Sequence, residues 1–195
     1  MIPLLLYNDL GHLQHRVLDE LRDHYYYPVT VPYALLYASE VPFGQRVYDQ
    51  FPSARSDIVE AGKCLSLGQG TATVFHLMRA MEVMLRVLSR ELGIGWAPSW
   101  ESHIKQISTK MTEDYKKKSV TWKRKEPLFR EICGDLNAVK MTWRNPTMHI
   151  VREYNLAEAN SVYSAVRAFI QRMADANFKE KGKPVAIAIA LASSA

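Results

Sequence analysis

The sequence has few features of a secreted, metal-binding or membrane-spanning protein. Only two of its 195 residues are cysteines, Cys64 and Cys133, and they form no CxxC pair. Since no cluster of histidines accompanies them, we expect no metal site and no cofactor, but two reduced, buried thiols in a cytoplasmic protein. No apolar run approaches the roughly 20 residues that a membrane-spanning helix needs. The sequence therefore predicts neither a disulfide scaffold, nor a zinc module, nor a membrane partner.

The two ends of the chain are also short of targeting features. The apolar run near Met1 has no basic residues ahead of it and reaches Asp9 too early for a signal peptide. The apolar run Val185 to Ala192 follows a polar hinge at residues 179–184, so we interpret residues 179–195 as a C-terminal tail.

The chain has an excess of positive charge, and this excess lies in one stretch, residues 105–130. The net charge is +5, and residues 105–130 hold nine basic and three acidic residues (9 − 3 = +6), so the rest sums to −1. Tyr115 and Trp122 are interleaved there and could stack on unpaired bases. The stretch predicts an RNA-binding band, with a solvated surface loop as the alternative. Its candidate RNA contacts are Lys116, Lys117, Lys118, Trp122, Lys123, Arg124 and Lys125.

Strand-like alternation is absent after Ser53, where helical periodicity takes over. Hydrophobic residues make up 48% and charged residues 23%, as in ordinary globular proteins. Ser53 is a candidate cap for the first helix, Ser99 for the third, and Asn155 with Glu158 forms a capping box for the last. The fold class is therefore all-α, a bundle of about five helices. Its expected helices cover residues 54–67, 71–92, a stretch from about 99, 125–143, and a stretch from 155.

The first fifty residues differ from the rest because prolines punctuate them. One helix fits before the prolines, with Leu10, Leu13, Val17 and Leu21 on one face. The following tyrosine- and proline-rich stretch, residues 25–48, is expected to be irregular. The predicted organisation is an N-terminal extension at residues 1–52, a helical domain at 53–178, and the tail.

The run WRNPTMH at residues 143–149 lies between the last two expected helices. Arg144 should leave the bundle at the end of one helix, and the turn at Pro146 should bring His149 back toward the same surface. A guanidinium can hold two phosphate oxygens, and an imidazole can carry a proton near pH 7. These groups suit RNA cleavage through the 2'-hydroxyl without a metal. In the alternative, Arg144 caps helix carbonyls and His149 fills a polar pocket.

With Arg144-Asn145-x-x-x-His149, the chain resembles the HEPN superfamily, helical domains marked by Arg-x(4 to 6)-His with a polar residue directly after the Arg. The resemblance covers about residues 57–174, including a paired first and second helix, a basic connector and the motif before the last helix. The chain is similar to an uncharacterised bacterial branch of that superfamily. The resemblance implies a HEPN-like bundle that forms a homodimer, with two motifs facing each other across a shared cleft.

Many HEPN domains are metal-independent ribonucleases in toxin–antitoxin, phage-defence or RNA-processing systems. The resemblance thus implies catalytic Arg144 and His149, oriented by Asn145, and a separate antitoxin or regulatory protein, because the chain lacks a nucleotidyltransferase signature. The alternative is a catalytically inactive HEPN module that binds nucleotide or a protein partner.

Polar side chains of the second HEPN helix often flank the motif. The candidates for such a supporting role here are His76, Arg79 and Glu82. His76 and Arg79 are one helical turn apart and share a face, whereas Glu82 projects differently. A solvated or core-bridging role is the alternative for each.

Overall fold

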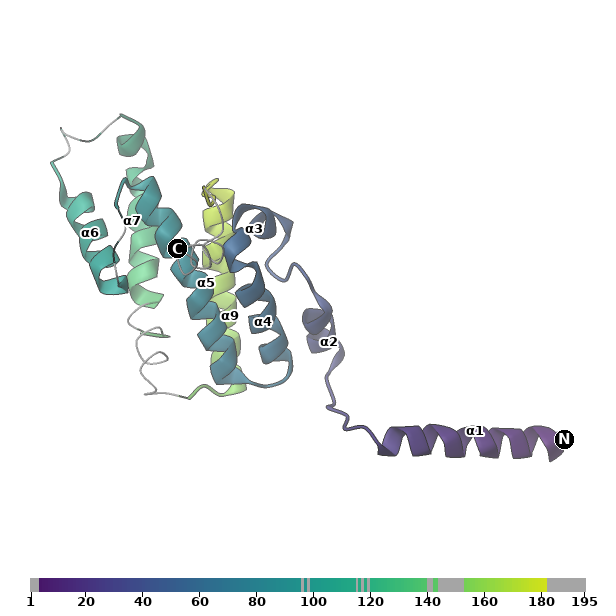
Figure 1. Cartoon of the computed structure of the whole chain (residues 1–195). Helices are drawn as coiled ribbons and strands as arrows, with labels where there is room; N and C mark the ends of the chain where they lie inside the picture. Colours follow the sequence, from purple (N-terminus) through teal and green to yellow (C-terminus); the bar gives the residue numbers. More distant parts are fainter. Residues whose placement is uncertain are drawn as a thin grey trace, which may run out of the picture. The chain divides into compact units, whose positions relative to one another are not determined.

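The computed structural model describes residues 4–95, 97, 99–114, 116, 118, 120–139, 142–143 and 153–181. These residues form helices and no strand, which confirms the all-α prediction. The elements, labelled in Figure 1, are α1 (Leu4–Arg22), α2 (Val31–Ala38), α3 (Gln45–Gln50), the 3-10 turn η1 (Pro52–Ala54), α4 (Arg55–Ser66), α5 (Gly70–Glu91), α6 (Trp100–Thr112), α7 (Val120–Val139) and α9 (Leu156–Asp175).

The chain divides into two units, Met1–Thr30 with α1 and Val31–Ala195 with the other helices. The division falls at residue 30 and not at residue 52, because α2 packs against α4 and α3 against α9. The irregular structure predicted for residues 25–48 is wrong for α2 and for the start of α3. Pro32 does not prevent α2, since it lies in the first turn, where a helix has no use for the missing N–H.

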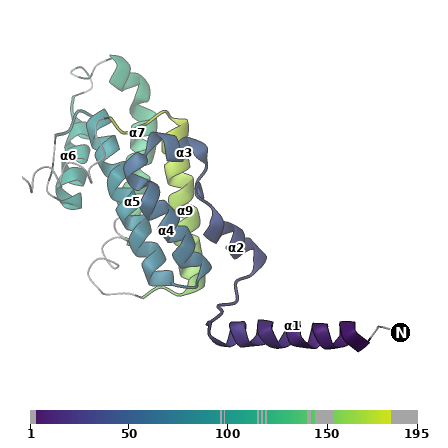
Figure 2. The ribbon, with the colours of Figure 1, turned by 45° about the vertical axis from the view of Figure 1, so that its right-hand side comes forward.

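The long helix α5 lies at the centre of the bundle. It packs against α4, α9 and α6, and Figure 1 and Figure 2 both show α4, α5 and α9 side by side. Its buried residues extend well beyond one narrow stripe. Among them, Met78, Met81 and Met84 are each at most 1% exposed to solvent. These methionines therefore fill the core.

The helix predicted at residues 125–143 begins earlier, at Val120, and ends at Val139. Pro127 consequently lies inside α7 instead of near its start. One face of α7 is apolar and faces the core, with Ile132, Leu136 and Val139 buried. On its other side α7 is tied to α9, where Arg172 bonds Glu131 and Asp135.

Two of the three predicted helix caps are present. The Ser99 hydroxyl accepts a hydrogen bond from the Ser102 backbone N–H at 3.1 Å. Asn155 and Glu158 form the full capping box, with side chain and backbone bonded in both directions. Ser53 does not cap α4, because its backbone N–H donates to Glu180 Oε2 at 2.8 Å and η1 precedes the helix.

Removing the capping box should measurably destabilise the bundle. Asn155→Ala leaves the N–H of Glu158 without its acceptor, so we expect a loss of about 1 kcal/mol in the free energy of unfolding. Urea titrations with an unchanged slope would measure it. Ser164→Ala, at an exposed position of the same helix, is the matched control and should leave stability unchanged or slightly raised. Equal stability of the two variants would contradict the prediction.

Both cysteines are free and only partly buried, not fully buried as expected. Burial raises the pKa of the Cys133 thiol to about 11, and it is also the main reason for a raised pKa at Cys64. Since the thiolate is the reactive form, neither residue is a good nucleophile near neutral pH.

Candidate functional site

The central motif falls outside the described residues. Arg144, Asn145 and His149, the predicted catalytic residues, all belong to residues 144–152, of which the structure gives no description. The segment is flanked by the described residues Trp143 and Glu153, and Tyr154 follows directly after Glu153.

The C-terminal side of the motif segment is held at the start of α5. The Tyr154 backbone N–H donates to Thr71 Oγ1 at 3.0 Å, and the Tyr154 hydroxyl donates to the Trp143 carbonyl at 3.4 Å. Gly70 allows this close approach, because a Cβ at that position would lie 2.1 Å from the Tyr154 carbonyl oxygen. After the motif segment the chain therefore rejoins the described bundle beside the first turn of α5, and Trp143 lies within reach of the Tyr154 side chain.

A cluster of three charged or titratable side chains joins α4 to α5. Asp57 Oδ1 lies 2.9 Å from His76 Nδ1 and 2.8 Å from Arg79 Nε. The Asp57 side chain is 13% exposed, that of His76 28% and that of Arg79 55%. The structure thus brings His76 and Arg79 together, as their spacing predicted, and adds Asp57.

The hydrogen bonds of the cluster fix the orientation of its side chains. Asp57 holds Nδ1 of the His76 ring, and Nε2 lies on the other side of the ring. The hydrogen bond and the charge of Asp57 raise the pKa of Arg79, so the guanidinium stays charged. His76 follows Thr71 by five residues, about 7.5 Å along the helix axis. The cluster therefore lies within about one and a half turns of the point where the motif segment is anchored.

Glu82 is not part of this cluster. Its Oε1 accepts a hydrogen bond from Trp100 Nε1 at 3.2 Å, and its Oε2 lies 3.8 Å from a guanidinium nitrogen of Arg86. With Ser99 and His103 these residues line a polar pocket of about 170 Å³ between α5 and α6. The three predicted supporting residues are therefore divided between two places.

His103 is the buried titratable residue of this pocket. Its Nδ1 lies 3.0 Å from the Ser89 hydroxyl, and the residue is 7% exposed. Burial first, and the charge of Arg86 second, lower its pKa, against weaker opposing effects of Ala97 and Glu82. No sequence pattern predicts this pairing, because Ser89 and His103 lie on different helices.

The lowered pKa of His103 predicts acid sensitivity. In the unfolded chain His103 takes up a proton near pH 6.5, whereas in the folded chain it does so only at a lower pH. The stability that the neutral imidazole contributes is therefore complete above pH 6.5 and is lost as the pH falls from there toward the pKa of the folded state. We expect unfolding free energy to fall between pH 7 and pH 5, by at most about 1.4 kcal/mol per pH unit from this proton.

Denaturant titrations of the wild type and of His103→Gln at several pH values measure this effect. The variant should show a flatter pH dependence than the wild type, and His15→Gln, on exposed α1, should retain the wild-type slope. Parallel pH profiles for the wild type and His103→Gln would contradict the assignment.

The predicted RNA-binding band is only partly exposed. Lys118 is buried, donates to the Met111 carbonyl at 2.8 Å and lies 4.0 Å from the centre of the Trp122 ring. Trp122 is 9% exposed and packs on Phe129, so its ring is not offered for stacking on bases, contrary to the prediction.

The remaining members of the band differ in their environments. Lys125 lies 3.9 Å from Glu91 Oε2, Lys123 is half-buried, and Lys116 and Arg124 are exposed. Lys117 and Tyr115 lie outside the described residues. The count of charges along the sequence therefore overstates the exposed positive surface.

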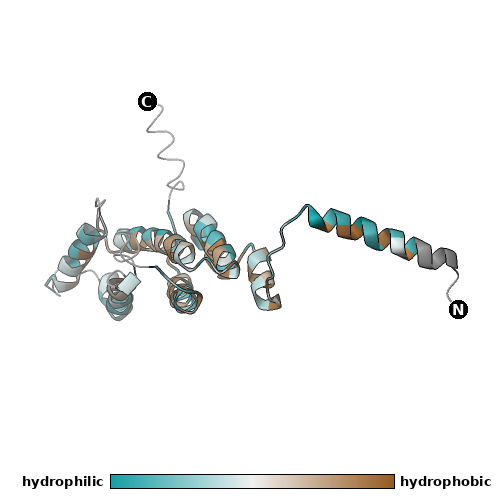
Figure 3. Cartoon of the chain, turned by 90° about the horizontal axis from the view of Figure 1, so that it is seen from below, coloured by the Kyte–Doolittle hydropathy of each residue, from teal (hydrophilic) through white to brown (hydrophobic). Residues whose placement is uncertain are grey.

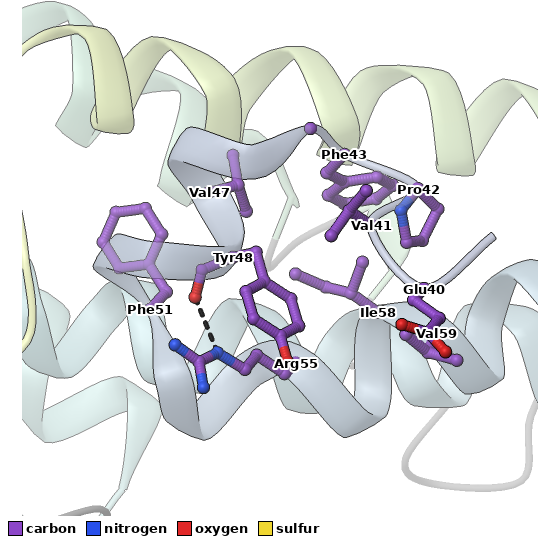
Figure 4. Close-up of a pocket in the computed structure, with 11 residues that line it drawn as sticks. Glu40, Val41, Pro42, Phe43, Val47, Tyr48, Phe51, Arg55, Ile58 and Val59 are labelled. Atoms are coloured by element: carbon purple, nitrogen blue, oxygen red, sulfur yellow. Dashed lines mark hydrogen bonds between the residues drawn. The ribbon is translucent and has the colours of Figure 1, made fainter.

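A second pocket lies where α3 meets α4 (Figure 4). It is lined mainly by apolar side chains, and its volume of about 10 Å³ holds at most one water molecule. At its edge Arg55 Nε donates to the Tyr48 carbonyl at 2.6 Å, and the guanidinium lies 4.0 Å from the centre of the Tyr48 ring. The pocket is therefore part of the packing between α3 and α4 and is too small to be a ligand site.

The described residues contain no group of three or more His, Cys, Asp or Glu residues that could hold a metal ion. In the same residues, no helix has both the length and the apolar character needed to cross a membrane. Comparison of the chain with models of protein families, with curated proteins and with solved structures gives no match.

Proposed function

We propose that this protein is a metal-independent endoribonuclease of the HEPN type, acting as a homodimer in the cytoplasm, as a toxin or phage-defence effector. The observation that carries the proposal is the motif Arg144-Asn145-x-x-x-His149 in the connection between α7 and α9. The HEPN resemblance rests on this motif and on the helices around it.

The fold supports the proposal through the anchoring of the motif segment. Tyr154 holds the end of that segment against Thr71 and against the carbonyl of Trp143, directly before Arg144. A hydrogen bond thus joins described residues on either side of the motif segment, which supports the proposal that Arg144 and His149 act together.

In the proposed reaction the 2'-hydroxyl of the RNA attacks the adjacent phosphate and the 5'-oxygen leaves, so the products carry a 2',3'-cyclic phosphate and a 5'-hydroxyl. His149 takes the hydroxyl proton or protonates the leaving oxygen, and in a homodimer the two copies of His149 divide these tasks. Arg144 stabilises the charge that builds on the phosphate, and Asn145 orients the pair.

Four exposed cations are our candidates for contacts with the RNA backbone. Lys116 and Arg124 are exposed, as are Lys105 and Arg130 on the flanking helices, although Arg130 also bonds Glu126. We assign the RNA backbone to these cations. The Asp57, His76 and Arg79 cluster adds a second imidazole near the anchored end of the motif segment.

The test is cleavage of end-labelled single-stranded RNA by the purified chain in EDTA. We expect fragments with 2',3'-cyclic phosphate ends from the wild type and none from the Arg144→Ala/His149→Ala double variant. No cleavage by the wild type, or equal cleavage by the double variant, would overturn the proposal. A chain that binds nucleotide or a protein partner without cleaving RNA would instead be a silent module of the same fold.

A further inference from the structure

The N-terminal unit has an apolar helix face that it cannot cover by itself. Large hydrophobic side chains of α1 are 42% to 58% exposed, and the unit Met1–Thr30 contains no second helix among its described residues. Figure 3 shows apolar residues recurring along α1 between polar ones. The exposed apolar residues are Leu10, Leu13, Val17, Leu18 and Leu21.

The spacing of these residues is suited to pairing with another helix. Leu10, Leu13 and Val17 follow one another at intervals of three and four residues. This interval places them in one narrow stripe, the seam along which two helices interlock side chains. A helix of 19 residues is about 28 Å long, enough for several turns of such a seam.

The charges beside the seam indicate which helix covers it. Asp9 and Arg16 are seven residues apart, so they lie within about 20° of each other on one flank of the stripe. Among the described residues neither forms an ion pair within the chain, whereas Arg22 pairs with Asp19. In an antiparallel copy centred on Leu13, Asp9 of one helix meets Arg16 of the other, and the same contact forms twice.

Other occupants fit these charges less well. A helix that lies on an anionic membrane surface carries lysine and arginine on its polar side. The polar residues of α1 are of mixed sign, with Asp9, Asp19 and Glu20 against Arg16 and Arg22, a sum of −1. A net charge of −1 on α1 is also unsuited to binding the negatively charged RNA backbone. Pairing of two copies of α1 remains, because so small a charge causes little repulsion between them.

We infer that α1 is a dimerisation helix, which pairs antiparallel with α1 of a second copy through Leu10, Leu13 and Val17 and through two Asp9–Arg16 contacts. The inference goes beyond RNA cleavage and stands whether or not the protein has that activity. It gives the N-terminal unit a function that does not depend on the bundle.

Molar mass of the full chain in solution tests the inference. At micromolar concentrations and low salt the wild type should have twice the chain mass of 22.3 kDa. Leu13→Asp should raise the dissociation constant of the dimer at least ten-fold, even where a cleft between the two bundles also holds the copies together, while His15→Asp, with the same new charge on the opposite face of α1, should leave that constant unchanged. A wild-type monomer, or a Leu13→Asp dimer as tight as that of the wild type, would overturn the inference.

A charge exchange tests the partner and the direction of pairing. Asp9→Arg and Arg16→Asp should each weaken the dimer, because each places two like-charged pairs across the seam. The double variant should restore it, because both contacts return with their signs reversed. If each single change has no effect, or the double variant is weaker than either, the antiparallel copy is not the occupant. Circular dichroism of each variant distinguishes lost pairing from lost folding.

Discussion

Replacing His149 with alanine should lower the rate of RNA cleavage by about two to four orders of magnitude. A positioned general acid or base contributes about that much to a proton-transfer step. In a shared cleft the change removes the imidazole from both copies, so no second His149 remains to replace it. Single-turnover cleavage of end-labelled RNA in EDTA measures the effect, because it separates the chemical step from product release.

Two further variants make this result specific. His15→Ala changes an exposed histidine of α1 and should leave the rate unchanged. Arg144→Lys keeps the positive charge but loses the two-pronged guanidinium contact with phosphate, so we expect an intermediate loss. A His149→Ala protein that folds and cleaves RNA at the wild-type rate would show that His149 carries no proton in the reaction.

The parts of the fold that the sequence predicted well depend on local signals. The capping box at Asn155 and Glu158 involves residues three apart, and it marks the start of α9 at the predicted position. The long periodic pattern of α5 likewise places its bounds within a residue of the structure. Such features are fixed by neighbours along the chain, so the sequence alone suffices.

The parts that the sequence predicted poorly depend on tertiary contacts. Helix α2 has only eight residues and contains Pro32, yet Tyr33 and Leu36 pack against the core and hold it in place. Packing of this kind offsets a weak local preference for helix, and a reading of propensity cannot detect it. The start of α7 was also predicted five residues too late, at residue 125, and Pro127 lies inside the helix.

The candidate site shows the same division. His76 and Arg79 were expected on one face because they are three residues apart on one helix, and they share Asp57. Asp57 itself was not predicted, because its approach depends on how α4 is rotated against α5. The burial of Lys118 was missed for a related reason, since its ion pair with Glu126 at 3.6 Å joins a loop to a helix. Counts of charge along a chain do not include such pairs.

Gly70→Ala should damage both the bundle and the proposed activity. The added Cβ would lie 2.1 Å from the Tyr154 carbonyl oxygen and 2.9 Å from that of Asn155. Both are backbone atoms, so no side-chain rotation relieves the clash, and Tyr154 must move away from the first turn of α5. We expect a loss of about 1–3 kcal/mol in the free energy of unfolding, the usual effect of overpacking.

The same displacement removes the anchor of the motif segment, since the Tyr154 N–H bond to Thr71 cannot keep its 3.0 Å length. RNA cleavage should therefore fall by more than the folded fraction does, which activity per folded molecule would measure. Gly134→Ala is the control, because no heavy atom lies within 4 Å of its added Cβ on α7. Because alanine favours the helix more than glycine does, Gly134→Ala should raise the free energy of unfolding by up to about 1 kcal/mol. If Gly70→Ala is as stable and as active as Gly134→Ala, the contact between Gly70 and Tyr154 does not position the site.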